Sequence, residues 1–309
     1  MTGSGVRNSG HSAFRRLLDR ARHNREDFNY ILQRFAMERL LYRLSVSCHA
    51  DRFVLKGASL FLVWKGHAYR VTRDADFLGT GEPSPVQMAQ TFSEICVVPC
   101  EPDDGMSFPA DHIEAVTIKE GQPYAGVRIT VVGLLHQARI PLQIDIGFGD
   151  VITPGPETVE FPTLLHDPRP RLKAYPRETV VAEKFEAMVR LGLANSRMKD
   201  FFDVRVLAEM FDFDGAVLAA AIKNTFLRRC SEVPSETPIA FTRDFTTNPS
   251  KKQQWRAFVR KAAAEAAPSE LAQAVADVAR FLEPVIASIR GGTVSPGFWQ
   301  AGQGWVVPQ

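Results

Sequence analysis

The spacing of hydrophobic residues along the chain predicts helices first, then strands, then helices again. Apolar residues recur at helical spacing over residues 14–21 and over residues 28–41. These patterns predict two helices, or one broken helix. The segment before them, residues 1–11, is rich in Gly, Ser and Asn and is predicted to be a disordered tail.

The central part of the chain changes to the pattern of strands. Residues 53–55 read as a short buried strand, residues 59–64 as the start of a helix and residues 73–78 as a second strand. After a further helical pattern at 86–98, residues 113–148 contain β-branched, alternating runs separated by turn formers. This last segment predicts an antiparallel meander that is added to the first two strands.

Prolines are concentrated in residues 153–177, where six of them occur. Such a density predicts an extended connector and a domain boundary. Helical patterns follow it as far as Ile289. We therefore predict an α/β domain at residues 12–165, a helical domain at residues 166–290 and a C-terminal tail at residues 291–309.

The composition is that of an ordinary globular protein. Hydrophobic residues make up 45% and charged residues 23% of the 309 residues. No run of about 18 uncharged apolar residues exists, so a membrane span is not expected. The N-terminus also lacks a continuous apolar segment of the signal-peptide type. These features favour a cytoplasmic protein with no membrane partner.

Cysteine spacing and net charge add little to this picture. Cys96 and Cys100 are four residues apart, but no second Cys or His pair stands at zinc-finger spacing, so the four cysteines are interpreted as buried free thiols. The net charge is +2, with arginines clustered in residues 7–43 and around residues 190–229. Solvated helix faces explain such clusters, and contact with an RNA backbone is the alternative.

The clearest chemical pattern lies between Phe53 and Phe77. Asp74 and Asp76 are two residues apart, so on a strand both carboxylates point to the same face. Hard oxygen ligands at this spacing suit Mg²⁺, whose remaining positions are taken by water and nucleotide phosphates. These residues therefore predict a site for one or two magnesium ions.

A glycine turn precedes the two carboxylates. Gly57 lets phosphates approach the backbone closely, Ser59 would add a hydroxyl, and Lys56 a positive charge. A third carboxylate on a neighbouring strand usually completes such a site. Asp145 is the candidate, because an acid in an otherwise apolar strand costs free energy unless it is paired or ligates metal; Asp150 is the fallback.

A glycine-led turn followed by a strand with Asp-x-Asp is the core signature of nucleotidyltransferases of the polymerase-β type. More specifically, the chain resembles the nucleotidyltransferase toxins of the AbiE abortive-infection type, which include the mycobacterial MenT toxins. The resemblance covers roughly residues 50 to 230. The residues that carry it are Lys56-Gly57-Ala58-Ser59-Leu60, Arg70-x-Thr72-x-Asp74-x-Asp76-Phe77, Asp145, Ala182-Glu183-Lys184-Phe185-Glu186-Ala187 and Arg197-Met198-Lys199-Asp200-Phe201-Phe202-Asp203.

The resemblance implies a toxin that transfers nucleotides from an NTP to the 3′ acceptor end of tRNA and so blocks aminoacylation. It also implies Mg²⁺ as cofactor and a cognate antitoxin as partner. On the same basis Asp74 and Asp76 bind metal, Lys184 contacts the nucleotide phosphates and Asp203 supports the site from the second domain. Ala58 departs from the family, which usually has a second glycine there, so the conformation of the loop over the phosphates depends on the backbone at Ala58.

Several residues keep two interpretations. Lys184 lies on an apolar helix stripe, where a lysine either snorkels at a domain edge or reaches into a cleft between the domains. Asp203 would otherwise form an ordinary helical ion pair with Lys199. Arg70 and Arg73 either balance the charge of the carboxylates or contact the triphosphate. Glu183 and Asp200 are interpreted as solvated residues or structural partners.

The predicted fold class is α/β: a polymerase-β-type nucleotidyltransferase domain with a mixed or antiparallel sheet, followed by a helical domain. The catalytic set is Asp74, Asp76, Asp145, Lys184 and Asp203, and Lys56, Gly57, Ser59, Arg70 and Lys184 are expected to bind the nucleotide. Two alternatives keep the fold: nucleotidylation or phosphorylation of a protein such as the antitoxin, and a catalytically silent binding module.

Overall fold

The computed structural model describes residues 9–66, 74–118, 126–262, 267–292 and 296–306, which form two compact units. The first unit contains the described residues up to Ala174, except for Asp150–Pro156. The second unit contains Asp150–Pro156 and the described residues from Tyr175 onward.

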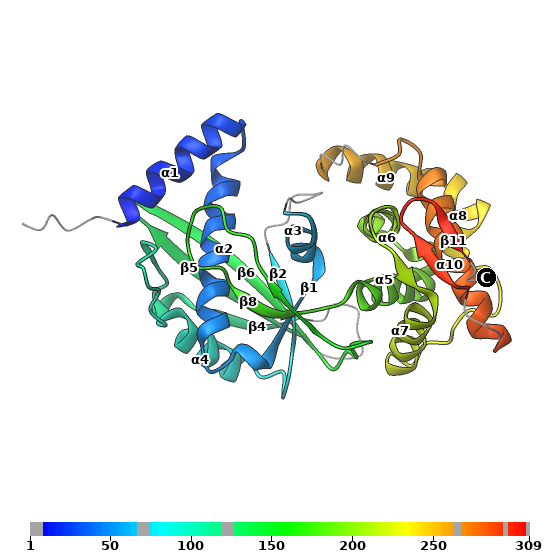
Figure 1. Ribbon diagram of the computed structural model, residues 1–309, viewed down its shortest axis with the longest axis horizontal. Helices are drawn as coiled ribbons and strands as arrows, with labels where there is room; N and C mark the ends of the chain where they lie inside the picture. Colours follow the sequence, from blue (N-terminus) through cyan, green and yellow to red (C-terminus); the bar gives the residue numbers. More distant parts are fainter. Residues whose placement is uncertain (1–8, 67–73, 119–125, 263–266, 293–295, 307–309) are drawn as a thin grey trace, which may run out of the picture. The chain divides into compact units, whose positions relative to one another are not determined.

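A mixed eight-stranded sheet forms the framework of the first unit (Figure 1). Its path is β3-β5-β6-β2-β1-β8-β7, and β4 also pairs with β5. The β1–β8 and β2–β6 pairs are parallel, whereas the other pairs are antiparallel. The strands are β1 (Phe53–Lys56), β2 (Ala75–Gly79), β3 (Met106–Ser107), β4 (Glu114–Ile118), β5 (Gly126–Leu135), β6 (Ala138–Phe148), β7 (Glu157–Glu160) and β8 (Arg171–Ala174).

Helices cover one face of this sheet. The helices α1 (Ser9–Asn24), α2 (Phe28–Val46) and α4 (Pro85–Cys96) contact the strands, and α2 runs across the sheet in Figure 1. Along β6, Ile140, Leu142, Ile144 and Ile146 are buried on this side, while alternate positions face the other way. A second face of the sheet is therefore left for polar side chains.

The second unit is mainly helical. It contains α5 (Arg177–Leu191), α6 (Met198–Met210), α7 (Gly215–Arg228), α8 (Arg243–Thr247), α9 (Pro249–Ala262) and α10 (Leu271–Gly291). The short strands β9 (Phe213–Asp214), β10 (Phe298–Gln300) and β11 (Gly304–Val306) form a small sheet beside them. Trp299 on β10 is buried, and its indole N–H donates to the carbonyl of Ala208 at 2.6 Å.

The structure confirms the predicted α/β fold class with a mixed sheet and a helical C-terminal part. Two helices, not one broken helix, precede β1, and the meander of β4, β5 and β6 is antiparallel as expected. The expectation of an extended connector at residues 153–177 was wrong for β7 and β8. Parallel pairing of β8 with β1 adds this segment to the main sheet despite its prolines.

The ends of the predicted segments also differ from the structure. Residues 9–11 begin α1, where Ser9 donates to Asp103 at 2.5 Å, and the rest of the predicted disordered tail lies outside the described residues. The division at residue 165 differs from the observed one, because β8 belongs to the first unit and Asp150–Pro156 to the second. Residues 298–306 of the predicted tail form the β10–β11 hairpin.

The cysteines follow the sequence interpretation only in part. Cys96 and Cys100 are buried free thiols, and burial raises the pKa of Cys96 to about 12 and that of Cys100 to about 11. Cys48 and Cys230 are exposed instead, because both follow the ends of helices. In the part of the chain that the structure describes, no helix is long and apolar enough to cross a membrane.

Candidate functional site

Four charged residues stand side by side across the middle of the main sheet. The strand register pairs Lys56 with Asp76, Asp76 with Asp145, and Asp145 with Arg128. Registered partners on neighbouring strands point to the same face, and here it is the face opposite α2 and α4. We call these four residues the charged row; its two carboxylates lie between a lysine and an arginine.

Gly57 and Asp76 are in close contact. Gly57 has φ +74°, and a Cβ at this position would lie 2.0 Å from Oδ2 of Asp76. No L side chain fits there, so glycine is required both by the backbone conformation and by the position of the carboxylate. The turn thereby places backbone directly over Asp76, as a phosphate-binding turn beside a carboxylate requires.

Ala58 stands where the family usually has a second glycine, and its backbone conformation does not require one. Among the described residues other than glycine, positive φ occurs at Arg25, His136 and Cys230, so Ala58 has an ordinary conformation. Gly57–Ser59 forms a single 3₁₀ turn that leads into α3 (Leu60–Lys65), which has only six residues. The expected helix after the turn is therefore short, and its dipole is small.

Asp145 is held by Arg128. The Nε of Arg128 donates to Oδ1 of Asp145 at 2.8 Å, and its Nη2 donates to Oδ2 at 2.7 Å. This bidentate geometry is the strong form of an Arg–carboxylate pair. Asp145 is buried and the side chain of Arg128 is 37% exposed. Pairing with Arg128 thus explains how an acid is accommodated in an otherwise apolar strand.

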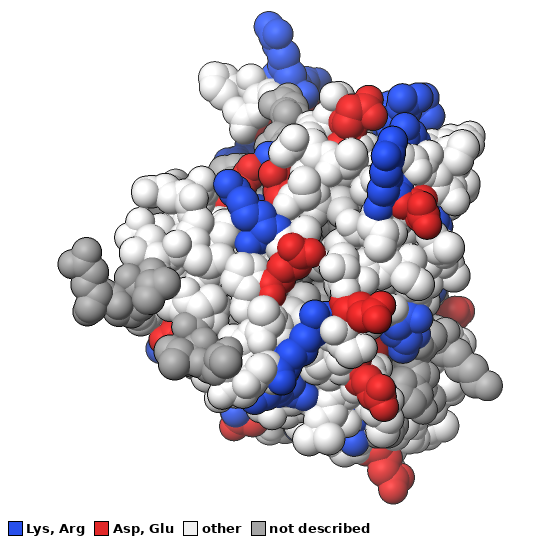
Figure 2. All heavy atoms as spheres, turned by 90° about the vertical axis from the view of Figure 1, so that its right-hand side faces the viewer, with Lys and Arg blue, Asp and Glu red and all other residues white. Residues whose placement is uncertain are grey.

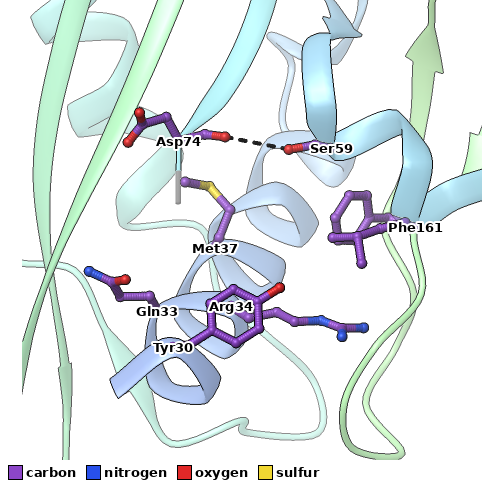
Figure 3. Close-up of a pocket in the computed structure, with 8 residues that line it drawn as sticks. Tyr30, Gln33, Arg34, Met37, Ser59, Asp74 and Phe161 are labelled. Atoms are coloured by element: carbon purple, nitrogen blue, oxygen red, sulfur yellow. Dashed lines mark hydrogen bonds between the residues drawn. The ribbon is translucent and has the colours of Figure 1, made fainter. Parts of the chain in front are cut away.

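Asp74 and Ser59 line a narrow pocket beside α2 (Figure 3). The hydroxyl of Ser59 donates to the backbone carbonyl of Asp74 at 3.5 Å, and the Asp74 carboxylate points away from Ser59 in Figure 3. Tyr30 and Arg34 on α2 line the other side. The pocket volume is about 20 Å³, enough for a water molecule and too small for a nucleobase.

In the second unit, Lys184 lies between two buried carboxylates. Its Nζ donates to Asp200 at 2.9 Å and to Asp203 at 2.8 Å, and Arg197 also donates to Asp200 at 2.6 Å. Burial alone raises the pKa of Asp200, but Lys184 and Arg197 outweigh it, so the pKa lies below its usual value. Asp200 is therefore the buried structural partner, not a solvated residue.

A second buried ion network surrounds Arg229. Its guanidinium pairs with Asp150 at 3.0 Å, with Glu183 at 3.2 Å and with Glu186 at 2.9 Å. Although burial lowers the pKa of Arg229, these carboxylates together raise it above its ordinary value. Glu183 also accepts from the hydroxyl of Tyr175 at 3.0 Å. Asp150, the fallback for a third metal ligand, thus belongs to a structural network of the second unit.

Carboxylate oxygens suit Mg²⁺, and Asp76 provides them beside the Gly57 turn, whereas Asp74 directly precedes β2 and lines the pocket beside α2. Asp145 fits less well, because both of its oxygens accept from Arg128. Among the described residues, Cys48, His49 and Glu94 are the one group of at least three possible metal ligands whose ligand atoms all lie within 4.8 Å of each other. Asp74, Asp76 and Asp145 therefore do not converge to that distance.

Sequence reasoning missed Arg128 and Arg229, and Arg70 lies outside the described residues. A signal for Arg128 exists: an arginine on the polar side of an alternating strand, next to the strand that carries Asp145. Arg229 has no such signal, since its partners come from two distant segments. The first unit brings together Lys56, Gly57, Asp76 and Asp145, and the second brings together Lys184 and Asp203.

This chain has the fold of a nucleotidyltransferase: a mixed sheet in which the Gly57 turn lies next to the Asp76 carboxylate of β2. The sequence model described as "Nucleotidyl transferase AbiEii toxin, Type IV TA system" matches residues 39–281. The chain belongs to this family of toxins of toxin–antitoxin systems, which confirms the resemblance seen in the sequence. A search of the curated proteins found no match.

Two solved structures from Helicobacter pylori are similar to this chain. One, assigned as a nucleotidyltransferase, has a TM-score of 0.48 and 14% identity over 85% of this chain and 97% of its own. The other, JHP933, has a TM-score of 0.46 and 13% identity over 85% of this chain and 94% of its own.

Proposed function

We propose that this toxin transfers nucleotides from an NTP to the 3′ acceptor end of tRNA in a Mg²⁺-dependent reaction and thereby stops aminoacylation. The observation that supports the proposal is the contact between Gly57 and Asp76, which is a member of the charged row. It places a turn without a side chain next to a carboxylate, and a triphosphate bound through metal requires both. The partner that neutralises the toxin would be its cognate antitoxin.

In the proposed reaction the 3′-hydroxyl oxygen of the RNA attacks the α-phosphorus, a new phosphodiester bond forms and pyrophosphate leaves with the bond electrons. Asp74 and Asp76 would hold Mg²⁺, which when bound offsets the charge that develops on the phosphates. Lys56 and Ser59 lie next to the Gly57 turn and would contact the triphosphate. Lys184 is proposed to contact the phosphates as well, with Asp203 as its support.

Asp145 has a different role in this proposal from the one suggested by sequence alone. Both of its oxygens accept from Arg128, so it has less capacity to take up the hydroxyl proton than an unpaired carboxylate. We infer that Asp145 positions Asp76 by holding the next strand of the charged row. The hydroxyl proton would then pass to solvent or to a group on the substrate.

The test is incubation of the purified chain with each α-labelled NTP in turn, Mg²⁺ and either total tRNA or the antitoxin, followed by sequencing of tRNA 3′ ends. Label at tRNA 3′ ends supports the proposal. Label that enters only protein contradicts it and favours modification of a protein partner. Chelation of divalent cations with EDTA should abolish the labelling, and excess Mg²⁺ should restore it.

Variants of the metal site sharpen this test. Asp74→Asn and Asp76→Asn should each lower incorporation by at least about 100-fold, equivalent to about 2.7 kcal/mol. The melting temperature of both variants is measured as well, so that lost incorporation is interpreted only where the variant is folded. Asp111→Asn, at an exposed aspartate of the same unit, is the control. Full growth inhibition by Asp74→Asn would favour a binding module without catalysis.

A further inference from the structure

The helix α9 is anchored through one face and basic on the other. Trp255 is fully buried, and its indole N–H donates to the carbonyl of Pro268 at 3.0 Å. Lys251 is also buried, and its ammonium donates to the carbonyl of Asn195 at 2.7 Å. These contacts fix the rotation of the helix, so the remaining side chains of α9 have a defined direction.

Lys252, Arg256 and Arg260 follow each other at intervals of four residues along α9. This spacing aligns them within a stripe, with steps of about 6 Å along the helix axis. We call these three residues the basic stripe. All three line one groove of about 510 Å³, together with the amide of Gln253. The α9 sequence contains no acidic residue that would neutralise the stripe from within the helix.

The charges of the basic stripe are only weakly compensated. Arg256 and Glu270 are 3.9 Å apart, with side chains that are 69% and 57% exposed, so this pair is worth little. Within the described ranges, no ion pair forms at Lys252 or Arg260. On the face seen in Figure 2, basic and acidic side chains are interspersed. A local stripe is therefore the relevant positive feature, not a broad basic surface.

We propose that the groove beside the basic stripe binds the phosphate backbone of the RNA substrate. The inference rests on the proposed function, since it assigns a binding surface for the RNA acceptor. Two cations are enough to hold a single small anion. Three cations in a line therefore fit the repeated phosphates of a nucleic-acid strand better. Arginine and glutamine side chains would donate to phosphate oxygens of the RNA backbone, so the contact would be independent of the RNA sequence.

The experiment measures binding of the full chain to deacylated total tRNA, without NTP, over a series of salt concentrations. The test variant combines Lys252→Gln, Arg256→Gln and Arg260→Gln, all at positions that are exposed or half-buried. The control combines Arg139→Gln, Arg169→Gln and Arg171→Gln, which are exposed in the first unit and remove the same charge. Circular dichroism melting checks that both variants are folded.

The stripe variant should lower the salt slope of log K against log[salt] by about 2 to 2.7, since each lost phosphate contact contributes about 0.7 to 0.9. Affinity at low salt should fall at least tenfold, while the control should change neither quantity. The three single variants should each lower the slope by about one third of this amount. Affinity for the labelled NTP, measured separately, should stay the same.

Three outcomes would overturn the inference. The first is that the salt slope of the stripe variant stays at the wild-type value, and the second is that the control variant lowers the slope equally. The third is that the stripe variant loses only binding to the antitoxin, which would make the groove a protein-docking surface. If the wild-type chain labels tRNA and the slope is unchanged, the inference alone fails. If the wild-type chain neither binds nor labels tRNA, the proposed function fails as well.

Discussion

At Gly57, the backbone conformation and the neighbouring carboxylate both exclude a side chain. Gly57→Ala should displace Asp76 and lower nucleotide incorporation by about 100-fold or more, because the proposed metal ligand moves. Gly66→Ala is a matched control. Gly66 has φ +75°, and no described residue lies within 4 Å of the point that a Cβ would occupy. The substitution therefore adds similar backbone strain, about 1 to 2 kcal/mol, without a clash among the described residues. Incorporation and melting temperature are measured for both. Equal loss of activity in the two variants would assign the effect to strain alone.

Lys184 has a structural role that any catalytic test must separate. Lys184→Met leaves Asp200 and Asp203 buried without their shared cation, which should cost about 3 kcal/mol or more of unfolding free energy. Lys223→Met, at an exposed lysine of α7, should change stability by less than about 0.5 kcal/mol. Urea unfolding measures both. Activity lost by Lys184→Met at a temperature where it is fully folded supports phosphate contact, and activity retained there contradicts it.

At the scale of elements, the β5–β6 hairpin carries one end of the charged row, Asp145 and Arg128. Arg128→Met should destabilise the first unit by about 3 kcal/mol, because the buried carboxylate of Asp145 loses both hydrogen bonds. The double variant Arg128→Met/Asp145→Leu should recover most of this stability, measured by urea unfolding. If Asp145 only positions its neighbour, the double variant also recovers incorporation to within about tenfold of wild type. Recovered stability with no activity would instead assign Asp145 to metal binding or proton transfer.

The elements show which parts of the site the sequence could predict. Local spacing predicts the turn at Gly57 and a strand that carries Asp76, and the structure has both at these positions, whereas Asp74 directly precedes the strand. Arg128 carries only the weaker signal of an arginine on the polar side of an alternating strand, and its contact with Asp145 depends on the register of the β5–β6 hairpin. β8 was also missed: prolines indicated a connector, but pairing with β1 overrides that local preference. The helical patterns succeeded for α5, α6 and α7 because their apolar stripes are long.

For the whole molecule, two buried carboxyl groups, one in each unit, link stability to pH in opposite directions. Lys184 and Arg197 lower the pKa of Asp200 against the effect of burial. An aspartate ordinarily titrates near pH 3.9, so the stability that Asp200 contributes is complete above this pH and is lost as pH falls through the lower folded-state pKa. The second unit should therefore lose this contribution only below about pH 4.

Glu38 in the first unit acts in a different pH range. Burial raises its pKa from 4.5 to about 7, although Arg34 and the N–H of Leu164 donate to its carboxylate and partly offset the effect. Between pH 4.5 and about pH 7, Glu38 is ionised in the unfolded chain but still protonated in the folded one. Raising the pH in this range therefore lowers the free energy of unfolding by on the order of 1 kcal/mol per pH unit, until Glu38 ionises in the folded chain too.

Glu38→Gln should therefore flatten the pH dependence of the first unit between about pH 4.5 and 7, because glutamine carries no charge at any pH. Glu114→Gln, at an exposed glutamate of β4, should leave the dependence as it is. Hydrogen exchange of α2 amides, followed by mass spectrometry at several pH values and corrected for the intrinsic exchange rate, reports on this unit separately from the second. If protection of α2 does not decrease between pH 5 and 7 in the wild-type chain, Glu38 is ionised throughout, and Arg34 and Leu164 compensate its burial in full.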